Sequence, residues 1–412
     1  MKLDAAAARA GPAELDRNSE SEASQDPTPI VHLDLSSVSA TICLAARETL
    51  LVFWLSDWPV GQVYVPGGTV AVEVATLARN AVDSDILAGA EAGLERETNG
   101  QHAAALRISV VICTRDRPAG LRRCLSSLLQ QTRPPDEIIV VDSASCKPCV
   151  RQIVAKAGVR YLRVERPGLD IARNTGVLVA TGDIIAFVDD DVVPHRRWLE
   201  RLVAAFDDRE IMAVTGLVLP AELETEAQEH FEKHWGFGRG YRRIEFAGEF
   251  FAADKKHGCP VWDIGAGASM AFRSEVFARI GLFDERLDVG AAGCSGDSEF
   301  WHRILTAGWR CRYEPAAVAY HYHRRDQADL ARQVFAYMRG HACALMVQYE
   351  RSRNQGNLRR AMVRTPAWLL RRLTRRVVKG ATDRDRFLRQ EMAGYISGIF
   401  FYLTTRRAAR SG

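Results

Sequence analysis

Three adjacent aspartates, Asp189, Asp190 and Asp191, follow an apolar run in the stretch FVDDDVVP. Adjacent carboxylates repel one another, so such a cluster at the end of a buried strand needs a cation or water to offset its charge. In an extended segment the side chains of residues i and i+2 point the same way. Asp189 and Asp191 are therefore expected to face one point, which suits Mg²⁺ or Mn²⁺. The alternative is a solvated acidic turn, because the DxD pattern is common by itself.

A second acidic group, Asp297 with Glu299 two residues later, lies in AAGCSGDSEF among Gly and other small residues. A loop of this composition lets the backbone approach a substrate closely. A carboxylate there can take the proton of an attacking hydroxyl. The competing interpretation is that Asp297 is the N-cap of a helix predicted for SEFWHRILTAG.

Two further pairs of residues have side chains that could bind a ligand. His321 and His323 share one face of the extended AVAYHYH, and either could reach a metal or a diphosphate. Isolated histidines, however, more often satisfy local hydrogen bonds. Trp262 and Asp263 precede IGAGAS and could stack on and hydrogen-bond a sugar, although Trp is also an ordinary core residue.

The elements that must position these residues alternate along the chain. Strands are predicted for ISVVICT, DEIIVVDSAS, GVRYLRVE and DIIAFVDDD. Helices are predicted for PAGLRRCLSSLLQQT, for residues 147–157, and for LDIARNTGVLVATG, which Gly182 would close. Continuous apolar strands alternating with helices indicate a doubly wound, mostly parallel α/β sheet. Ligands bind such sheets at the carboxyl ends of strands, where Thr114, Arg115, Asp142 and the aspartate cluster fall.

Shifts in composition divide the chain into four parts. Residues 1–30 are typical of a disordered leader and lack the apolar core of a signal peptide. Residues 31–100 are expected to form a small α+β appendage with a linker, and residues 107–325 the α/β domain. A tail of basic amphipathic helices is predicted for residues 326–412. Between residues 219 and 261, a long polar and aromatic insertion is expected to shape a cleft.

The composition is that of a globular protein, with 47% hydrophobic and 26% charged residues in 412. The sequence contains no stretch of about 18 uninterrupted apolar residues, so no membrane-spanning helix is predicted. Nine irregularly spaced cysteines argue against a disulfide framework and predict a cytoplasmic location. Cys146 and Cys149 form a lone CxxC without the second pair that a zinc site would need.

The net charge of +4 conceals an uneven distribution. From Arg351 onward, sixteen Arg and Lys residues face three acidic ones, a net of +13 that leaves −9 for the first 350 residues. Basic amphipathic helices containing residues such as Trp368 commonly lie in a membrane interface, which predicts peripheral contact with the inner face of an anionic membrane. Alternatively, these helices pack against the α/β domain and present Arg to water. No module typical of nucleic-acid readers is recognisable, so no nucleic-acid partner is expected.

Four blocks in order resemble the family-2 glycosyltransferases with the GT-A fold. They are ISVVICTRDRPAGLRRCLSSLLQQTRPPDEIIVVDSAS, GLDIARNTGVLVATGDIIAFVDDDVVPHRRWLE, GAGASMAFRSEVFARIGLFDERL and GDSEFWHRILTAGWRCRYEPAAVAYHYH. The resemblance implies an inverting transfer, dependent on Mg²⁺ or Mn²⁺, from a nucleotide-diphosphate sugar to a hydroxyl. It also implies a glycan, lipid-linked or small-molecule acceptor, in the synthesis of cell-surface polysaccharide or glycoconjugate.

The resemblance further implies roles for single residues. Asp191 would be the principal metal ligand, with Asp189 contacting ribose or metal and His321 or His323 completing the site. Asp297 would be the general base. The acid that usually precedes it is Gly296 here, which leaves Glu299 as a second candidate base. The other implied positions are Thr114, Arg115, Asp142, Arg173 and Asp190 for the nucleotide sugar, and Trp262, Asp263 and Gly267 for the acceptor or sugar.

Two other classes of function remain open at this point. A nucleotidyltransferase can share an α/β sheet and paired carboxylates, but it is expected to carry a Gly-rich basic loop, of which CTRDRPAG is a poor version. A non-catalytic nucleotide- or glycan-binding relative is the other alternative. The presence of Asp142, Asp189, Asp191 and Asp297 argues against it.

Overall fold

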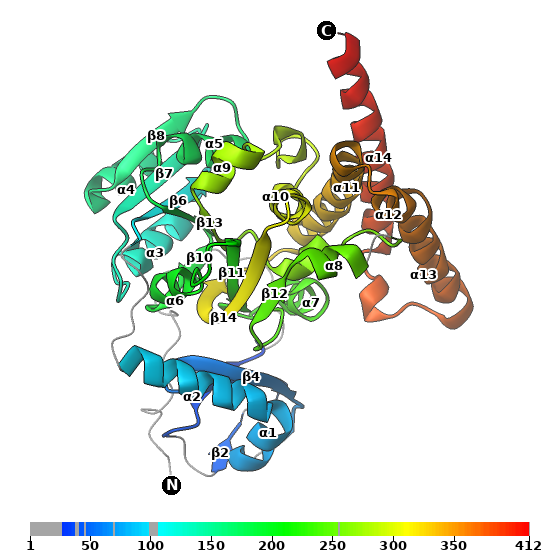
Figure 1. Cartoon of the computed structure of the whole chain (residues 1–412). Helices are drawn as coiled ribbons and strands as arrows, with labels where there is room; N and C mark the ends of the chain where they lie inside the picture. Colours follow the sequence, from blue (N-terminus) through cyan, green and yellow to red (C-terminus); the bar gives the residue numbers. More distant parts are fainter. Residues whose placement is uncertain are drawn as a thin grey trace.

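A nine-stranded sheet is the central element in the computed structural model of the chain (Figure 1). The structure describes residues 27–37, 41–44, 47–68, 71–98, 106–253 and 256–411. The leader predicted for residues 1–30 therefore lies almost entirely outside the described residues. The strands of the sheet are β6 (Ile108–Thr114), β7 (Glu137–Ser143), β8 (Arg160–Val164), β9 (Ile184–Asp189), β10 (Val192–Pro194), β11 (Ile211–Pro220), β12 (Ile244–Phe246), β13 (Ser269–Arg273) and β14 (Arg310–His321).

The strand order is β10-β14-β11-β13-β9-β6-β7-β8, with β12 paired to β14. Strands β6 to β9 run parallel, as do β11 and β14. Strands β10, β12 and β13 are antiparallel to their neighbours. The predicted doubly wound, mostly parallel α/β sheet is therefore confirmed.

Helices cover both faces of the sheet, which explains why β6 and β9 are continuously apolar rather than alternating. One face packs against side chains such as Leu121 and Trp198, and the other against Ala172 and Phe300. The helices on the first face are α3 (Pro118–Leu128), α4 (Cys149–Ala157) and α6 (Trp198–Ala204), and those on the second are α5 (Leu169–Val179), α9 (Glu275–Ile280) and α10 (Gly296–Thr306).

The N-terminal elements lie below the sheet in Figure 1 and share a core with it. One face of β3 carries Leu50, Val52 and Trp54 into the core of the α/β domain. The other face carries Leu51 and Phe53 into a separate core beneath the two N-terminal helices. The elements are β1 (Ile30–Asp34), β2 (Thr41–Cys43), β3 (Thr49–Leu55), β4 (Trp58–Val65), β5 (Ala71–Glu73), α1 (Val74–Ala81) and α2 (Ser84–Thr98).

The remaining segments are helical and lie beside the sheet. The insertion contributes α7 (Glu226–Trp235) and α8 (Gly248–Ala253), and short 3-10 turns occur at η2 (Val261–Ile264), η3 (Glu285–Leu287) and η5 (Asp383–Asp385). The tail comprises α11 (Gln327–Ser352), α12 (Gln355–Arg359), the π-helical turn η4 (Arg360–Arg364), α13 (Thr365–Lys379) and α14 (Leu388–Ser411). Within the described residues, the helices all lack the combination of length and apolar character that crossing a bilayer requires.

Part of the basic charge of the tail is neutralised inside the protein. Arg372 is buried, and it forms ion pairs with Asp385 and Glu391. Arg351 binds Asp284 of the α/β domain at 2.8 Å. Arg351 thus joins the tail to the α/β domain, whereas Arg372 pairs inside the tail and is not presented to water as the alternative expected.

Two local expectations are wrong. Helix α5 ends at Val179 with Ala180 as an extended C-cap, so Gly182 does not close it. Gly182 instead lies against β6, where an added Cβ would be 2.6 Å from the backbone nitrogen of Ser109. Asp190 and Asp191 form a turn between β9 and β10 and do not extend the strand.

Candidate active site

A cavity of about 1410 Å³ opens at the carboxyl ends of β6 and β9 and extends to the tail helices. We call the part near the strand ends the sheet end, lined by Thr114, Asp189, Asp191, Arg173 and Asp297 among others. The tail end is the part lined by residues 234–237, by Arg239, Trp262 and Asp263, and by residues of α11, η4 and α13. Residues from the sheet, the insertion and the tail thus enclose one space.

The aspartate cluster meets at the sheet end although its backbone turns. Asp189, Asp190 and Asp191 all line the cavity, together with Thr114 and Arg115. Thr114 Oγ1 donates to Asp190 Oδ2 at 2.7 Å. The parallel register pairs Cys113 of β6 with Asp189 of β9, and this register aligns the two strand ends.

Arg117, which the sequence analysis did not single out, partly neutralises this cluster. Its Nη1 lies 2.9 Å from Asp190 Oδ1 and 2.8 Å from Asp191 Oδ2. Gly120 of α3 allows the helix to approach, because an added Cβ would lie 2.6 Å from the carbonyl oxygen of Asp190. The position of Arg117, three residues after Thr114 at a strand end, was a signal that could have found it.

The pKa values of the three carboxylates in the cluster are shifted in opposite directions. Burial raises the pKa of Asp189 to about 6; Arg173 opposes this shift and Asp191 adds to it. Burial, and then the charge of Asp191, also raise the pKa of Asp190. Burial alone would raise the pKa of Asp191 too, but His321 and nearby arginines lower it well below its usual range. Asp191 is therefore the carboxylate most firmly held in its charged form.

The structure brings His321, and not His323, to the cavity. His321 is the last residue of β14 and pairs with Val192 of β10, next to the aspartate cluster. Its Nε2 lies 3.4 Å from Asp191 Oδ1. His323 lies behind it, with the two Nδ1 atoms 2.8 Å apart, and does not line the cavity.

Helix α5 carries Arg173 to the sheet end. Its guanidinium is buried, with Nη1 3.2 Å from Asp170 Oδ1 and Nη2 3.6 Å from Asp189 Oδ1. Burial raises the pKa of Asp170 to about 7, against the effect of Arg173. The start of the helix is fixed by Asp288, whose carboxylate accepts hydrogen bonds from the Leu169 and Ile171 amides at 2.6 and 3.0 Å.

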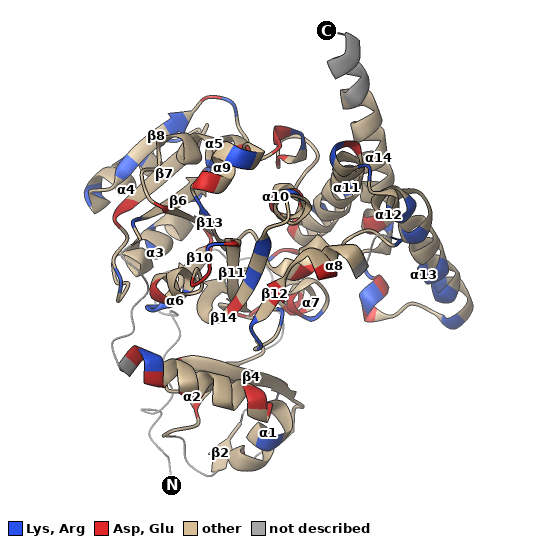
Figure 2. Cartoon of the chain, viewed as in Figure 1, with Lys and Arg blue, Asp and Glu red and all other residues tan. Residues whose placement is uncertain are grey.

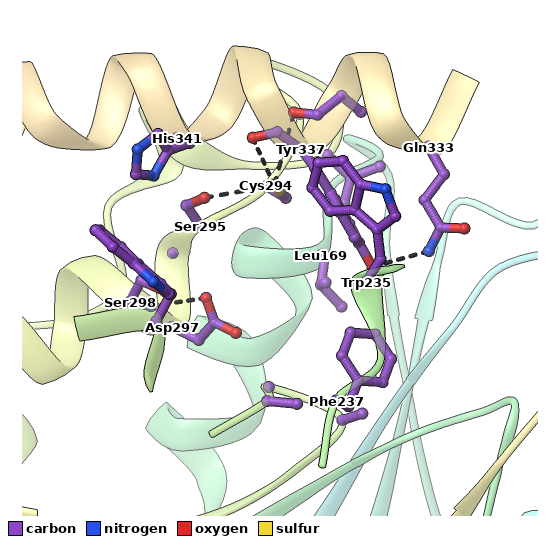
Figure 3. A pocket seen from close by; sticks show the side chains of 18 of the residues that line it. Leu169, Trp235, Phe237, Cys294, Ser295, Asp297, Ser298, Gln333, Tyr337 and His341 are labelled. Atoms are coloured by element: carbon purple, nitrogen blue, oxygen red, sulfur yellow. Dashed lines mark hydrogen bonds between the residues drawn. The ribbon is translucent and has the colours of Figure 1, made fainter. Parts of the chain in front are cut away.

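Asp297 lies in the first turn of α10 and points into the cavity (Figure 3). Ser295 is the N-cap, in the left-handed region at φ 83°, so the interpretation of Asp297 as N-cap is wrong. Asp297 Oδ1 accepts a hydrogen bond from the Ser298 amide at 2.6 Å. A Cβ at Gly267 would lie 2.5 Å from Asp297 Oδ2 and 3.1 Å from Arg173 Nη2. The absence of a side chain at Gly267 therefore leaves the path between these two groups open.

Besides His323, two predicted site residues do not line the cavity. Glu299 is fully buried within α10, where it pairs with Arg303 at 2.9 Å and Arg351 at 3.1 Å, so the structure argues against it as a base. Asp142 is also buried and accepts hydrogen bonds from Tyr161 Oη and the Ser145 amide at 2.8 and 2.9 Å. Asp142 thus braces the loop after β7 from behind, and the structure gives it no direct access to a ligand in the cavity.

The tail end is aromatic and basic. Trp262 and Asp263 line it, and the Arg360 guanidinium lies 4.8 Å from the Trp262 ring centroid. Figure 3 shows Trp235 of the insertion beside Tyr337 of α11, and the two ring centroids are 6.0 Å apart; Phe237 and His341 line the same cavity. Figure 2 shows Lys and Arg along α13. The lining arginines here are Arg239, Arg332, Arg360, Arg364, Arg371 and Arg384.

Sequence reasoning missed most of the tail end. Trp235 and Phe237 belong to the insertion for which only a general cleft-shaping role was predicted. Tyr337 and Arg371 lie in helices that were expected to face a membrane or water. No motif marked these residues, because only the packing of the tail against the insertion brings them to the cavity.

A third group of ligand-type side chains lies next to the tail end. Donor atoms of His230, His234 and Asp383 lie within 4.8 Å of one another. His234 Nε2 is 2.7 Å from Asp383 Oδ2, and His230 Nδ1 is 3.3 Å from Asp383 Oδ1. These contacts join α7 to the tail.

The residues at the sheet end fit a divalent cation. Asp189 and Asp191 offer carboxylate oxygens and His321 an imidazole nitrogen, donor types that suit Mn²⁺ and Mg²⁺. Asp191 Oδ2 is bound by Arg117, but its Oδ1 faces His321 Nε2 at 3.4 Å. A positive charge stabilises Asp191 Oδ1 at this point, and either a protonated His321 or a bound cation can supply it.

Comparison with known proteins gives the family of the central domain. Residues 109–281, which include the aspartate cluster, match the sequence profile of Glycosyl transferase family 2. Residues 109–281 of the chain thus resemble a family 2 glycosyltransferase domain. The family resemblance and the GT-A fold predicted from the sequence are confirmed.

Relatives of this glycosyltransferase domain include the Pre-mycofactocin glycosyltransferase of Mycobacterium tuberculosis, 31% identical over 247 residues. That match covers 59% of this chain and 48% of the relative, so the chain spans about half of the length of that protein. Glycosyltransferase AglE of Haloferax volcanii is 24% identical over 222 residues, covering 52% of this chain and 66% of the relative. Among solved structures, mannosyltransferase PcManGT of Pyrobaculum calidifontis matches with a TM-score of 0.46 and 19% identity, over 72% of this chain and 87% of that one.

Proposed function

We propose that this chain is a metal-dependent, inverting glycosyltransferase that moves a sugar from a nucleotide-diphosphate sugar to an acceptor hydroxyl. The observation that carries the proposal is that Asp297 and the aspartate cluster face one cavity, with Gly267 and Arg173 between them. A donor whose diphosphate lay at the aspartate cluster would present its anomeric carbon toward Asp297.

Asp297 is the general base in this mechanism. Its Oδ1 is held by the Ser298 amide, which leaves Oδ2 toward the open path at Gly267. As the acceptor oxygen attacks the anomeric carbon, Oδ2 takes the proton of the hydroxyl. Attack on the side opposite the departing diphosphate inverts the anomeric configuration.

The sheet end stabilises the departing diphosphate. Arg173 and Arg117 are placed at the aspartate cluster, where a diphosphate would lie beside them. Asp189, Asp191 and His321 would hold Mn²⁺ or Mg²⁺, which supplies positive charge to the leaving group without proton transfer. Thr114 and Arg115, at the end of β6, line the cavity and would contact the nucleoside.

The acceptor enters from the tail end in this proposal. Trp262 and Trp368 offer faces on which sugars or apolar chains stack, and the six lining arginines favour a negatively charged group. A glycan or lipid-linked acceptor carrying a phosphate or carboxylate fits this surface, as in the synthesis of cell-surface polysaccharide or glycoconjugate.

The test is calorimetric binding of UDP, GDP and dTDP, each with and without Mn²⁺. The proposal expects one nucleotide to bind wild type only with metal, and Asp191→Ala to abolish that binding. Asp183→Ala, at the opposite end of β9, is the matched control and should bind like wild type. If the nucleotide binds wild type and Asp191→Ala equally, the aspartate cluster is not a diphosphate site and the proposal fails.

Turnover separates the enzyme from the alternatives. A glycosyltransferase releases a nucleoside diphosphate from its sugar donor, whereas a nucleotidyltransferase releases pyrophosphate from a nucleoside triphosphate. A non-catalytic relative binds the nucleotide and releases neither. Product analysis by ion-exchange chromatography with each of these donors distinguishes the three outcomes.

We also propose that the tail contacts an anionic membrane surface at the cytoplasmic face. One stripe of α14 exposes Ile396, Phe400 and Leu403, spaced by four and three residues. Helix α13 exposes Val377 and Val378 beside its arginines. Co-sedimentation with phosphatidylglycerol vesicles but not with phosphatidylcholine vesicles is expected, and Phe400→Ser should weaken it. Equal recovery in the supernatant with both vesicle types would contradict the proposal.

A further inference from the structure

A line of four side chains runs from the aspartate cluster into the protein interior. Asp191 Oδ1 lies 3.4 Å from His321 Nε2, and His321 Nδ1 lies 2.8 Å from His323 Nδ1. His323 Nε2 lies 2.9 Å from Glu232 Oε2. Asp191 and His321 line the cavity, whereas His323 and Glu232 lie behind them. The line therefore connects the candidate metal site to α7, a helix of the insertion.

The two members behind the cavity are held tightly. The side chain of His323 is 1% exposed and that of Glu232 is 9% exposed. The Phe231 ring packs 4.6 Å from His323, and the Phe237 ring meets His321 edge-on at 5.1 Å. Burying a carboxylate costs free energy unless the group is hydrogen-bonded. The buried Glu232 carboxylate therefore depends on its contact with His323.

Hydrogen-bond chemistry gives this line a direction. A neutral imidazole has one N–H donor and one acceptor nitrogen. The Glu232 carboxylate only accepts, so a neutral His323 carries its proton on Nε2. His323 Nδ1 is then the acceptor for the Nδ1–H of His321. His321 Nε2 is left with a lone pair that faces Asp191.

We propose that Glu232 and His323 are positioning residues, which fix the tautomer and orientation of His321 for a divalent cation bound at Asp191. The inference rests on the proposed function, because it assigns a supporting role at the same metal site. Metal-binding histidines commonly donate their second ring nitrogen to such a partner. Here the partner is a second histidine, and the carboxylate behind it comes from the insertion.

Binding of Mn²⁺ alone to the full chain, followed by electron paramagnetic resonance of the free ion, tests the inference. Glu232→Gln is expected to weaken Mn²⁺ binding by roughly 10- to 100-fold, because a neutral amide accepts a weaker hydrogen bond from His323 Nε2 than a carboxylate does and can also donate to it, so it no longer fixes the tautomer of His323. Glu229→Gln is the matched control: Glu229 lies on the same helix but binds Thr28 Oγ1 at 2.5 Å. It should bind Mn²⁺ as wild type does.

Substitutions of His323 separate positioning from general loss of structure. His323→Asn retains a group that can accept from His321 Nδ1–H, so most of the Mn²⁺ affinity should remain. His323→Leu fills space without an acceptor and should match Glu232→Gln. Equal affinity of the Asn and Leu variants would contradict the positioning role.

A spectroscopic readout does not depend on any variant folding. Long-range ¹H–¹⁵N correlation of the histidine rings in wild type loaded with Mg²⁺, which is diamagnetic, should show His321 protonated on Nδ1 and His323 on Nε2. Protonation of a neutral His321 on Nε2 would overturn the inference.

The outcomes distinguish this inference from the proposed function. If Asp191→Ala loses Mn²⁺ binding and Glu232→Gln does not, the metal site stands and the positioning role fails. If Asp191→Ala binds Mn²⁺ like wild type, or if wild type binds none, the metal site itself fails and the positioning role fails with it.

Discussion

The two ends of the cavity are built by different means. At the sheet end, functional side chains sit where parallel strands stop, and the pairing of Cys113 with Asp189 fixes their relative positions. At the tail end, Trp235, Tyr337 and Arg371 come from three helices that are far apart in the sequence. The first end depends on hydrogen-bond register and the second on helix packing.

This difference suits the sheet end to the chemical step and the tail end to the selection of the acceptor. Backbone register holds side chains to within a fraction of an ångström, which is what bond-making groups require. Helices that pack through long arginines can vary their lining without disturbing the sheet. We therefore expect substitutions at the sheet end to change the rate of the chemical step, and substitutions at the tail end to change the apparent affinity for the acceptor.

The largest expected effect is at Asp297. Asp297→Asn removes the base while keeping the shape, so kcat should fall by about 10³-fold with nucleotide affinity unchanged. Steady-state kinetics and calorimetry measure the two quantities.

Glu299→Gln is the comparison for this substitution. Glu299 is buried between Arg303 and Arg351, so its loss should lower the free energy of unfolding by about 3 kcal/mol and leave kcat of the folded enzyme nearly unchanged. If Glu299→Gln lost most of its kcat while Asp297→Asn remained active, Glu299 would be the general base and Asp297 would not.

The next effect concerns Gly267, between the base and Arg173. An added methyl group would lie 2.5 Å from Asp297 Oδ2 and force the carboxylate or the bound sugar to move. Gly267→Ala should lower kcat by about 10²-fold, because misplacement by about 1 Å has this cost. Gly89→Ala is the control, since nothing lies within 4 Å of that added methyl group. Full activity of Gly267→Ala would show that the path between the two groups is wider than we infer.

Acid should loosen the attachment of the tail. Burial alone would raise the pKa of Asp284, but hydrogen bonds from Arg286 and Arg351 lower it well below its usual range. Its contribution is therefore present above the unfolded-state pKa of about 3.9 and is lost as the pH falls below it. We expect this carboxylate to contribute on the order of 2 kcal/mol at neutral pH.

Urea unfolding at pH 7 and pH 3 measures this contribution. Asp284→Asn should be less stable than wild type at pH 7, and the difference should narrow at pH 3, where the unfolded state already binds the proton. The stability difference between Asp284→Asn and wild type would stay constant with pH if Asp284 were not ionised in the folded state.

The sequence alone predicted the sheet and the aspartate cluster, because strand periodicity and strand ends are local properties, and the Gly-bearing loop before α10 pointed to Asp297. It did not decide between His321 and His323, since both lie on one face of an extended segment and only α7 makes one of them inaccessible. It placed Asp142 at the ligand, whereas Tyr161 and Arg163 occupy its carboxylate. Tail arginines drawn inward, such as Arg372, were unpredictable because their acidic partners are fixed only by helix packing.

The smallest effect sharpens the role of the tail end. Arg371 lines the cavity from α13, and its Nε donates to the carbonyl oxygen of Ala367, so its other donors can reach an acceptor. Losing one charge-assisted hydrogen bond should raise KM for an anionic acceptor about tenfold in Arg371→Ala, with nucleotide affinity and kcat unchanged. Arg389→Ala, on α14 outside the cavity, is the control. If Arg371→Ala lowered kcat while KM stayed constant, α13 would be acting on the chemical step, and the division of labour between the two ends would not hold.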